Sequence, residues 1–82
     1  MLSIVYFAWV REAIGRDEEQ VERPDPGMTV ADLVAMLAAR GGGYAEALGD
    51  TARLRAAVDQ RFVAMDSLIG EAKEMALFPP VT

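Results

Sequence analysis

The 82-residue chain contains no cysteine and no histidine. The first absence excludes disulfides, thiolate metal sites and cysteine nucleophiles, and the second excludes imidazole bases and His-ligated zinc. A chain without cysteine needs no oxidising compartment, so we expect a cytoplasmic protein. A long apolar run is also missing, since none approaches the roughly 18 residues of a membrane span. The apolar N-terminus lacks a basic region and a cleavage site, and we expect it to stay in the mature protein.

Basic residues are scarce. Eight Lys and Arg stand against thirteen Asp and Glu, which gives a net charge of −5. Nucleic-acid binding requires clustered positive charge, so we expect no nucleic-acid partner. An acidic surface suits a basic protein partner, although excess acid usually serves only solubility. The run Asp17-Glu18-Glu19 and the pair Glu71 and Glu74 lack His and a Ca²⁺-loop spacing, which predicts a solvated surface and no metal site.

Apolar residues, by contrast, are plentiful at 52% of the chain, enough for a packed core. The N-terminal segment 2–9 combines β-branched and aromatic residues without a helix breaker, which predicts a strand. The period of two places its side chains in two rows, one with Leu2, Ile4, Tyr6 and Ala8, the other with Ser3, Val5, Phe7 and Trp9. Because both rows are largely apolar, this strand is either covered on both faces or has one face that waits for a partner.

The strongest helix signal runs from Thr29 to Arg40. Its apolar residues fall at i, i+3, i+4 and i+7, and Thr29 with Asp32 stands where a capping box begins a helix. The triplet 41–43 is all glycine, and we interpret it as a helix stop. A phosphate-binding loop is disfavoured because the glycines follow the helix and no Gly-Lys-Ser/Thr comes after them.

The other elements are short. We expect a helical turn at 10–15, a charged edge strand within 17–23, a turn at 24–27 and a helical turn at 44–48. Strands are predicted at 53–58, at 62–65 after a hairpin connection at 59–61, and at 74–78, where two prolines end the chain's last strand. The predicted core, to which we assign no function, comprises Val30, Leu33, Val34, Leu37, Leu54, Val58, Met75 and Leu77. This order predicts an α+β fold in which one main helix covers one face of a sheet and leaves the other face bare.

Three segments resemble one family in order and spacing. Residues 7–12 (FAWVRE) resemble its "FA-x-VRE" opening, residues 56–60 (AAVDQ) its "AAVNQ" hairpin, and residues 76–82 (ALFPPVT) its "FPPVTGG" tail. The family is the small subunit of molybdopterin synthase, a relative of ubiquitin and of the thiamine-pathway sulfur carrier. The resemblance covers nearly the whole chain and implies a ubiquitin-like β-grasp with a mixed sheet of about five short strands. Asp59 replaces the usual asparagine, and the sequence ends at Thr82, before the family's Gly-Gly.

The resemblance also implies a chemistry. In this family an ATP-dependent activating enzyme, related to ubiquitin-activating enzymes, adenylates the terminal glycine, and a sulfur donor converts it to a thiocarboxylate. The large synthase subunit then takes in the tail, and the sulfur passes to a pterin precursor to form the dithiolene that later holds molybdenum. The small subunit is a carried co-substrate in a heterotetramer. It needs no catalytic residue, no metal and no cofactor of its own.

We therefore expect the function of residues 1–82, one carrier domain, to reside in its tail, about 78–82, and in one surface. Pro79 and Pro80 favour an extended backbone that points Val81 and Thr82 away from the domain, although Pro-Pro alone also simply ends a strand. Phe7 and Phe78 are predicted to contact partners from the bare sheet face, where the family places hydrophobic residues, while Phe62 is left open between the core and that interface. The tail's final two residues would precede the glycine that carries the sulfur.

Arg11 is predicted to pair with a partner carboxylate or with Glu74, an ordinary surface salt bridge being an equal alternative. Two rival functions remain open. One is a sulfur carrier of a related pathway: thiamine or cysteine synthesis, both of which the FPPVT tail disfavours, or a tungsten cofactor, which the sequence does not separate from molybdenum. The other is a β-grasp interaction module without sulfur chemistry, which the absent Gly-Gly keeps open. An enzyme in its own right is disfavoured, because no residue set forms a nucleophile–base pair.

Overall fold

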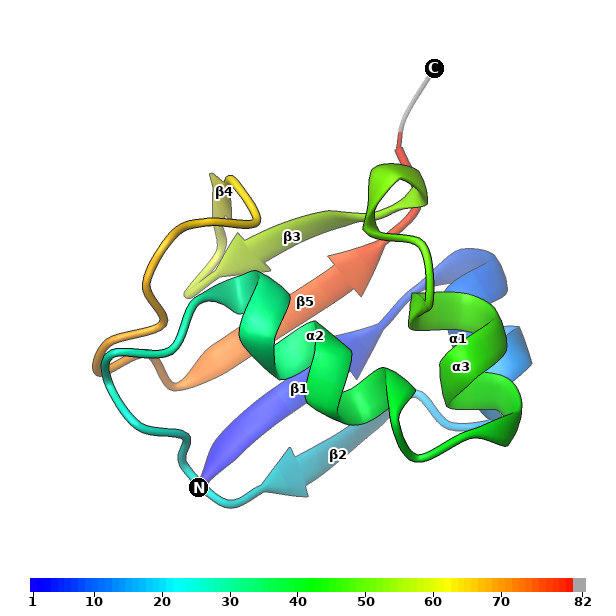
Figure 1. The fold of residues 1–82 in the computed structure, drawn as a ribbon, viewed down its shortest axis with the longest axis horizontal. Coiled ribbons are helices and arrows are strands. Elements are labelled where there is room, and N and C mark those ends of the chain that lie inside the picture. Colours follow the sequence, from blue (N-terminus) through cyan, green and yellow to red (C-terminus); the bar gives the residue numbers. More distant parts are fainter. Residues whose placement is uncertain (81–82) are drawn as a thin grey trace.

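The computed structural model describes residues 1–80 and contains a five-stranded sheet with helices on one side (Figure 1). The strand order is β2-β1-β5-β3-β4. The two central strands, β1 and β5, run parallel, and every other neighbouring pair is antiparallel. The elements in chain order are β1 (Leu2–Tyr6), α1 (Ala8–Ile14), β2 (Glu18–Val21), α2 (Val30–Ala38), α3 (Gly42–Leu48), the 3-10 turn Thr51–Arg53, β3 (Arg55–Val58), β4 (Arg61–Val63) and β5 (Glu74–Phe78).

The predicted α+β fold is confirmed, with a mixed sheet and α2 as the helix that crosses one face (Figure 1). The capping box that begins α2 is also present: the Thr29 hydroxyl accepts from the Asp32 N–H, and the Asp32 carboxylate accepts from the Thr29 N–H. The helix ends slightly earlier than predicted, at Ala38. The apolar stripe of α2 is fully buried, as its spacing predicted.

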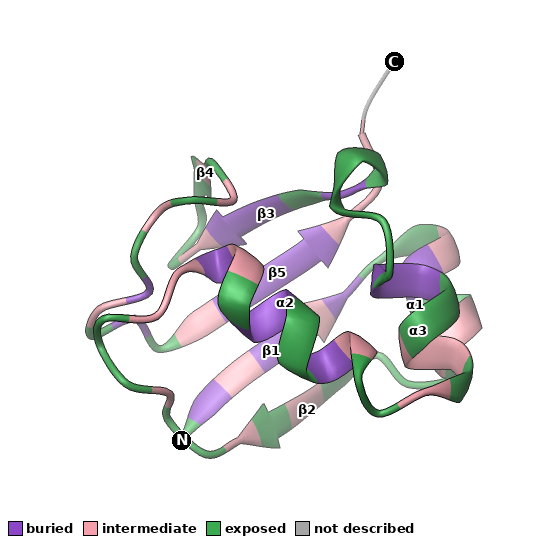
Figure 2. Cartoon of the chain, viewed as in Figure 1, coloured by how far each residue is buried: buried purple, intermediate pink, exposed green. Residues whose placement is uncertain are grey.

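The core lies between this helical layer and the sheet. One row of β1 (Leu2, Ile4 and Tyr6) packs against α2, α3 and the inward residues of β5, Met75 and Leu77. Figure 2 shows the central strands largely buried, whereas the edge strands β2 and β4 contain only exposed and half-buried residues. All predicted core residues are buried except Val58, which is half-buried at the end of β3. The predicted charged edge strand and the predicted last strand are both confirmed.

The first strand is shorter than its sequence predicts. It ends at Tyr6, and Ala8, which has a φ of 54°, begins α1. The carbonyl of Phe7 accepts from the N–H groups of Val10 and Arg11, so the chain turns into a helix where a strand was predicted to continue to Trp9. Residue propensity alone does not distinguish a strand from a helix here, because residues 7–14 contain no glycine or proline that would break either one. Burial of Val10 in the core decides for the helix.

The glycine triplet does more than stop α2. Gly41, with a φ of 81°, caps α3, while Gly42 and Gly43 form its first turn. Gly43 packs so closely against α1 that a Cβ at this position would overlap the carbonyl oxygen of Ala13. The interpretation of the triplet as a helix stop is therefore incomplete. Two of its glycines belong to the next helix, and Gly43 permits the close approach of α1 and α3.

Candidate partner interface and tail

The three phenylalanines of the chain lie together on the sheet face that no described helix covers. Their side chains, with those of small neighbours, form what we call the phenylalanine face: Val5, Phe7, Ala57, Phe62, Ala76 and Phe78. The Phe62 and Phe78 rings are 5.7 Å apart at their centroids and tilted by 50°. Phe62 is 85% exposed and Phe7 46% exposed. Large aromatic side chains this open on one face are typical of a protein-binding surface.

Sheet register explains how residues far apart in sequence reach this face. Phe78 ends β5 on the side opposite to Met75 and Leu77, whose side chains are in the core. Phe62 lies opposite Ala57 in the β3–β4 ladder and shares its face. The backbone N–H of Phe7 donates to the Leu77 carbonyl, which holds the end of β1 beside the end of β5. Sequence reasoning left Phe62 open between core and surface, and the structure places it on the surface.

A shallow hollow runs across the face. It has a volume of about 550 Å³, a floor formed by Ala57 and Ala76, and a polar end at Gln60 and Glu74. A smaller hollow of about 270 Å³ adjoins it at the tail end, between Phe62, Phe78 and Arg55. Both are open grooves and not enclosed cavities. Their shape suits side chains of another protein better than a cofactor.

The tail leaves the sheet next to this face. Pro79 and Pro80 directly follow β5 and are half-buried, and they end the strand as predicted. Figure 1 shows this segment continuing in the direction of β5, away from the helices. The predicted tail residues Val81 and Thr82 lie outside the described residues. Phe78 therefore belongs to the apolar face and also forms the root of the tail.

Arg11 does not pair with Glu74, one of its predicted partners. Its Nε lies 3.8 Å from Asp17 Oδ1, and both side chains are largely exposed. The topology explains the difference. Glu74 begins β5 at the far end of the sheet, whereas α1 follows the end of β1. The surface salt bridge is thus the alternative that the structure supports, and the prediction of a partner carboxylate remains untested.

Trp9 was predicted on the same row as Phe7, which is wrong. It lies in α1 and packs, half-buried, against the core, while the Arg53 guanidinium stacks 4.9 Å from its ring centroid. The helix begins one residue before Trp9, so the period-two pattern no longer applies to it. Trp9 is consequently not part of the phenylalanine face.

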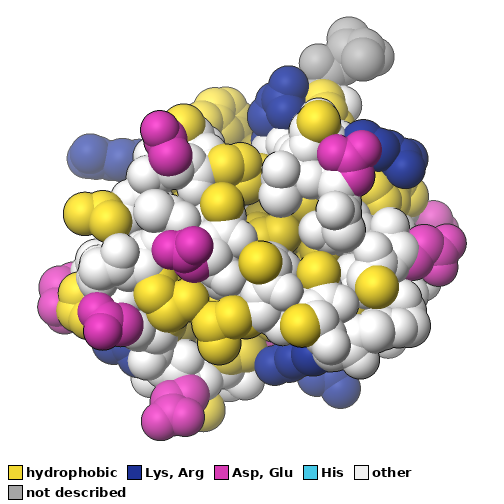
Figure 3. Space-filling view, viewed as in Figure 1, with side chains coloured by type: hydrophobic (Ala, Val, Ile, Leu, Met, Phe, Trp, Pro, Cys, Tyr) yellow, Lys and Arg dark blue, Asp and Glu magenta, His cyan; other side chains and the backbone are white. Residues whose placement is uncertain are grey.

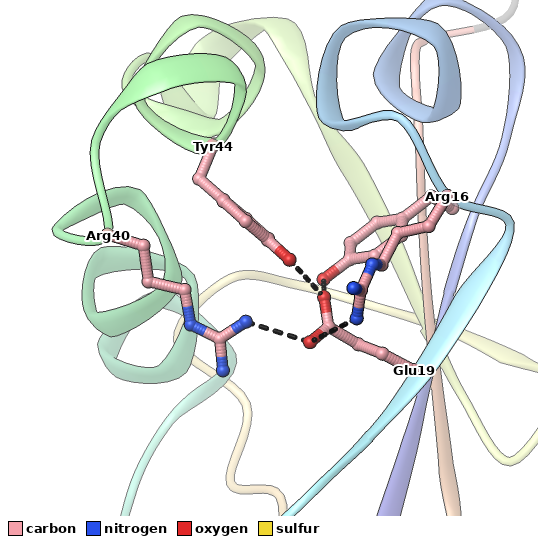
Figure 4. A network of polar contacts seen from close by, with 5 residues as sticks. Arg16, Glu19, Arg40 and Tyr44 are labelled. Carbon is pink, nitrogen blue, oxygen red and sulfur yellow. Dashed lines mark hydrogen bonds and ion pairs between the residues drawn. The ribbon is translucent and has the colours of Figure 1, made fainter.

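Glu19 was predicted to be solvated, and this too is wrong. Its side chain is only 7% exposed and accepts hydrogen bonds from the hydroxyls of Tyr6 (2.8 Å) and Tyr44 (2.6 Å) and from Arg40 (2.8 Å). Arg16, in the segment just before β2, places its Nη1 3.4 Å from Glu19 Oε1. Figure 4 shows Tyr44, Arg40 and Arg16 converging on the carboxylate. The glutamate joins β2 to β1, to α3 and to the segment that follows α2.

The charges of this cluster stabilise one another. Burial by itself raises the pKa of Glu19, but the hydrogen bonds from Tyr44, Arg40 and Tyr6 outweigh it and hold the pKa of this carboxyl below its ordinary value. Burial first, and then the hydrogen bond to Glu19, raise the pKa of Tyr6. The hydrogen bond to Glu19 raises the pKa of Arg40. All these groups have partners inside the chain, so we assign the cluster to stability.

Other kinds of site find no support in residues 1–80. No group of three or more His, Cys, Asp or Glu side chains in this range is arranged to hold a metal ion. No helix among these residues has the length and apolarity needed to cross a bilayer. The distinctive feature of the described chain is an exposed apolar sheet face at the root of a proline-containing tail. A central parallel strand pair, flanking antiparallel strands and a helix across one face define the ubiquitin-like β-grasp class.

Comparison with known proteins narrows this class. The model of the ThiS family matches residues 4–82, so the chain belongs to the ThiS family. The chain is 40% identical over all its 82 residues to a molybdopterin synthase sulfur carrier subunit of Escherichia coli, and 37% identical to one of Haemophilus influenzae; in both cases 98% of the relative is covered. A solved structure, the small archaeal modifier protein 1 of Haloferax volcanii, superposes with a TM-score of 0.67 at 20% identity and covers 98% of this chain and 97% of its own. At that identity the last likeness shows the fold alone.

Proposed function

We propose that this chain is the sulfur-carrier subunit of a molybdopterin synthase. The observation that carries the proposal is the full-length match to two sulfur carrier subunits of that synthase, at 40% and 37% identity. The geometry supports it, because β5 ends at Phe78 and is followed directly by Pro79 and Pro80, which leave the sheet beside an exposed apolar face. A carrier needs a projecting terminus and a surface by which enzymes hold the rest of the molecule.

The chemistry proceeds at the chain terminus. A carboxylate must acquire a leaving group before sulfur can replace one of its oxygens. An ATP-dependent adenylating enzyme supplies it: the terminal carboxylate oxygen attacks the α-phosphate of ATP, and pyrophosphate leaves. Sulfide delivered by a sulfur donor then attacks the acyl carbon, and AMP departs as the leaving group, which leaves a thiocarboxylate without any change of oxidation state. We propose that this terminus is the Gly-Gly that follows the FPPVT segment in the family.

The chain's own residues present its C-terminus to the partner enzymes. Phe7, Phe62 and Phe78 provide the apolar contact with the large subunit and with the adenylating enzyme, and Arg11 contributes at the margin. Pro79, Pro80, Val81 and Thr82 enter the partner's channel. Pro-Pro keeps the entering segment extended before it binds, which lowers the entropy lost on ordering. The folded domain thus provides the surface that partners bind, the tail carries the reacting group, and the chain requires no general acid or base of its own.

The test is the intact mass of the protein with the C-terminus that its gene encodes. Incubated with the adenylating enzyme, ATP and a sulfur donor, the chain should gain about 16 Da, the difference between sulfur and oxygen. Omission of ATP provides the control, because without adenylation no oxygen is replaced. A chain whose mass never changes under the complete mixture, while it still binds the large subunit, would instead be a β-grasp interaction module without sulfur chemistry.

A further inference from the structure

One basic side chain lies among the apolar groups of the phenylalanine face. Arg55 begins β3 in register with Phe78 and alternates with the buried Ala56, so its side chain points to the uncovered side of the sheet. It lines the smaller hollow together with Phe62 and Phe78. Among the strands of residues 1–80, Arg55 is the only Lys or Arg on this face, since Arg61 in β4 alternates with Phe62 and points to the other side.

The guanidinium of Arg55 is held in place but not neutralised. Its Nη1 donates to the carbonyl of Leu54 at 2.8 Å, which orients the group at the rim of the hollow. Within residues 1–80, no carboxylate forms an ion pair with it, whereas Arg11, Arg16 and Arg40 each have one. The carbonyl accepts from one of the five N–H donors of this exposed side chain, and residues 1–80 provide no other hydrogen-bond acceptor for it.

A partner that covers this face must remove water from that charge. Desolvating an unpaired guanidinium is costly, and a carboxylate that accepts two parallel N–H bonds is the group that best offsets the cost. The apolar surroundings, Phe62 and Phe78, strengthen such a pair because they exclude water from it. A partner with an apolar or basic surface at this point would bind poorly.

The opposite end of the same face carries the opposite charge. Glu74, at the start of β5, borders the larger hollow. It lies four positions before Phe78 on one strand, a distance of about 13 Å at the usual rise per residue. A carboxylate of the partner is therefore attracted to Arg55, at the end of the face next to the tail, and repelled by Glu74 at the opposite end. Figure 3, which views the helical side, also shows Lys and Arg side chains next to the end of the described chain.

We infer that Arg55 binds a carboxylate of the large subunit and thereby fixes which end of that partner lies over the root of the tail. The inference rests on the proposed function, which supplies the partner, and adds a basic anchor at the tail end of a docking surface whose central residues are apolar. The expected role is positional: the pair selects the docking orientation in which the tail meets the partner's channel.

The experiment measures binding of the purified large subunit to immobilised chain over a series of salt concentrations. Arg55→Glu should weaken the affinity about tenfold or more and reduce the salt dependence of the association rate. Arg55→Leu keeps an apolar stem and should also bind more weakly, because the partner's carboxylate is left without its pair. Arg61→Glu is the matched control, the same charge reversal on the other side of the sheet, and should change binding little.

The outcomes separate the anchor from the docking face. If Phe78→Ala weakens binding but Arg55→Leu binds as tightly as the unmodified chain with the same salt dependence, the role of Arg55 is refuted. The phenylalanine face would in that case still be the docking surface. If Arg55→Glu and Arg61→Glu weaken binding equally, the effect is one of net charge, and the anchor is refuted as well. If Arg55→Glu affects only the adenylating enzyme, the carboxylate belongs to that enzyme and the inference is wrong. A sulfur-transfer failure with normal binding would bear on the proposed function alone.

Discussion

The hydroxyl of Tyr44 donates a 2.6 Å hydrogen bond to the carboxylate of Glu19, and this contact ties α3 to the edge strand β2. Tyr44 belongs to α3, the helix whose first turn packs against α1, and α1 begins at the residue after Phe7. The arrangement therefore connects Glu19 and the groups that bind it to the end of the sheet where α1 begins. Its stability can be tested separately from partner binding.

Removal of the Glu19 carboxylate should destabilise the fold strongly. Glu19→Ala leaves the Tyr6 and Tyr44 hydroxyls and the Arg40 guanidinium without their shared acceptor, and we expect a loss of about 3 kcal/mol in the free energy of unfolding. Urea denaturation followed by circular dichroism measures it. Glu18→Ala, an exposed position on the same strand, is the control and should change stability by less than about 0.5 kcal/mol. Equal small losses in both variants would contradict the role of the cluster.

The same carboxyl should make stability depend on pH. The pKa of Glu19 is lowered in the folded state, so its contribution is fully present above the unfolded value, near 4.5, and is lost as the pH falls through the lower folded value. Denaturation midpoints measured on acidification should therefore fall more steeply for the unmodified chain than for Glu19→Gln. Parallel curves would show that Glu19 has the same pKa in the folded and unfolded chains.

Gly43 should not tolerate a side chain. Because an added Cβ would overlap the Ala13 carbonyl oxygen, Gly43→Ala must push α1 and α3 apart, at a cost of about 2 kcal/mol. Thermal unfolding provides the measurement. Gly27→Ala serves as the matched control, since a Cβ there would make an ordinary contact 3.4 Å from the Asp25 carboxylate. A stabilised Gly43→Ala variant would mean that the two helices are packed less closely than the structure shows.

Asp59 should be replaceable by asparagine but not by alanine. Its φ of 48° lies in the left-handed region, which Asn and Asp adopt more readily than Ala, and its Oδ1 accepts from the backbone N–H groups of Lys73 (2.9 Å) and Glu74 (3.1 Å). We expect Asp59→Asn to change stability by less than about 0.5 kcal/mol and Asp59→Ala to cost about 2 kcal/mol. Chemical denaturation of both variants distinguishes them. Equal losses would indicate that the carboxylate charge, and not the acceptor oxygen, matters.

Phe62 should contribute to binding and hardly to folding. Because the Phe62 side chain is 85% exposed, truncating it removes little buried apolar area. The free energy of unfolding of Phe62→Ala should therefore lie within about 0.5 kcal/mol of that of the unmodified chain. Its affinity for the large subunit should fall about tenfold or more, as for an aromatic anchor in an interface. Leu68→Ala, an equally conservative truncation of an exposed side chain near the start of α2, is the control and should leave affinity unchanged.

The sequence predicted the elements whose signals are local. The apolar spacing and cap of α2, the charged edge strand and the proline-terminated β5 are all read from neighbouring residues, and the structure contains each of them. The hairpin after Val58 is also present, with Asp59 and Gln60 both at positive φ as a two-residue turn requires. The sheet face without a covering helix also followed from the prediction of a single main helix on the other face.

Tertiary structure decided what depends on distant neighbours. Glu19 occupies an acidic run that looks solvated, and only the approach of Tyr6, Tyr44 and Arg40 from three other segments buries it. Phe7 and Phe78 line the same hollow because β1 and β5 pair in parallel, a register that neither strand encodes alone. The physical reason is that periodicity specifies which side of an element is apolar, whereas burial and charge pairing depend on which other elements pack against that side.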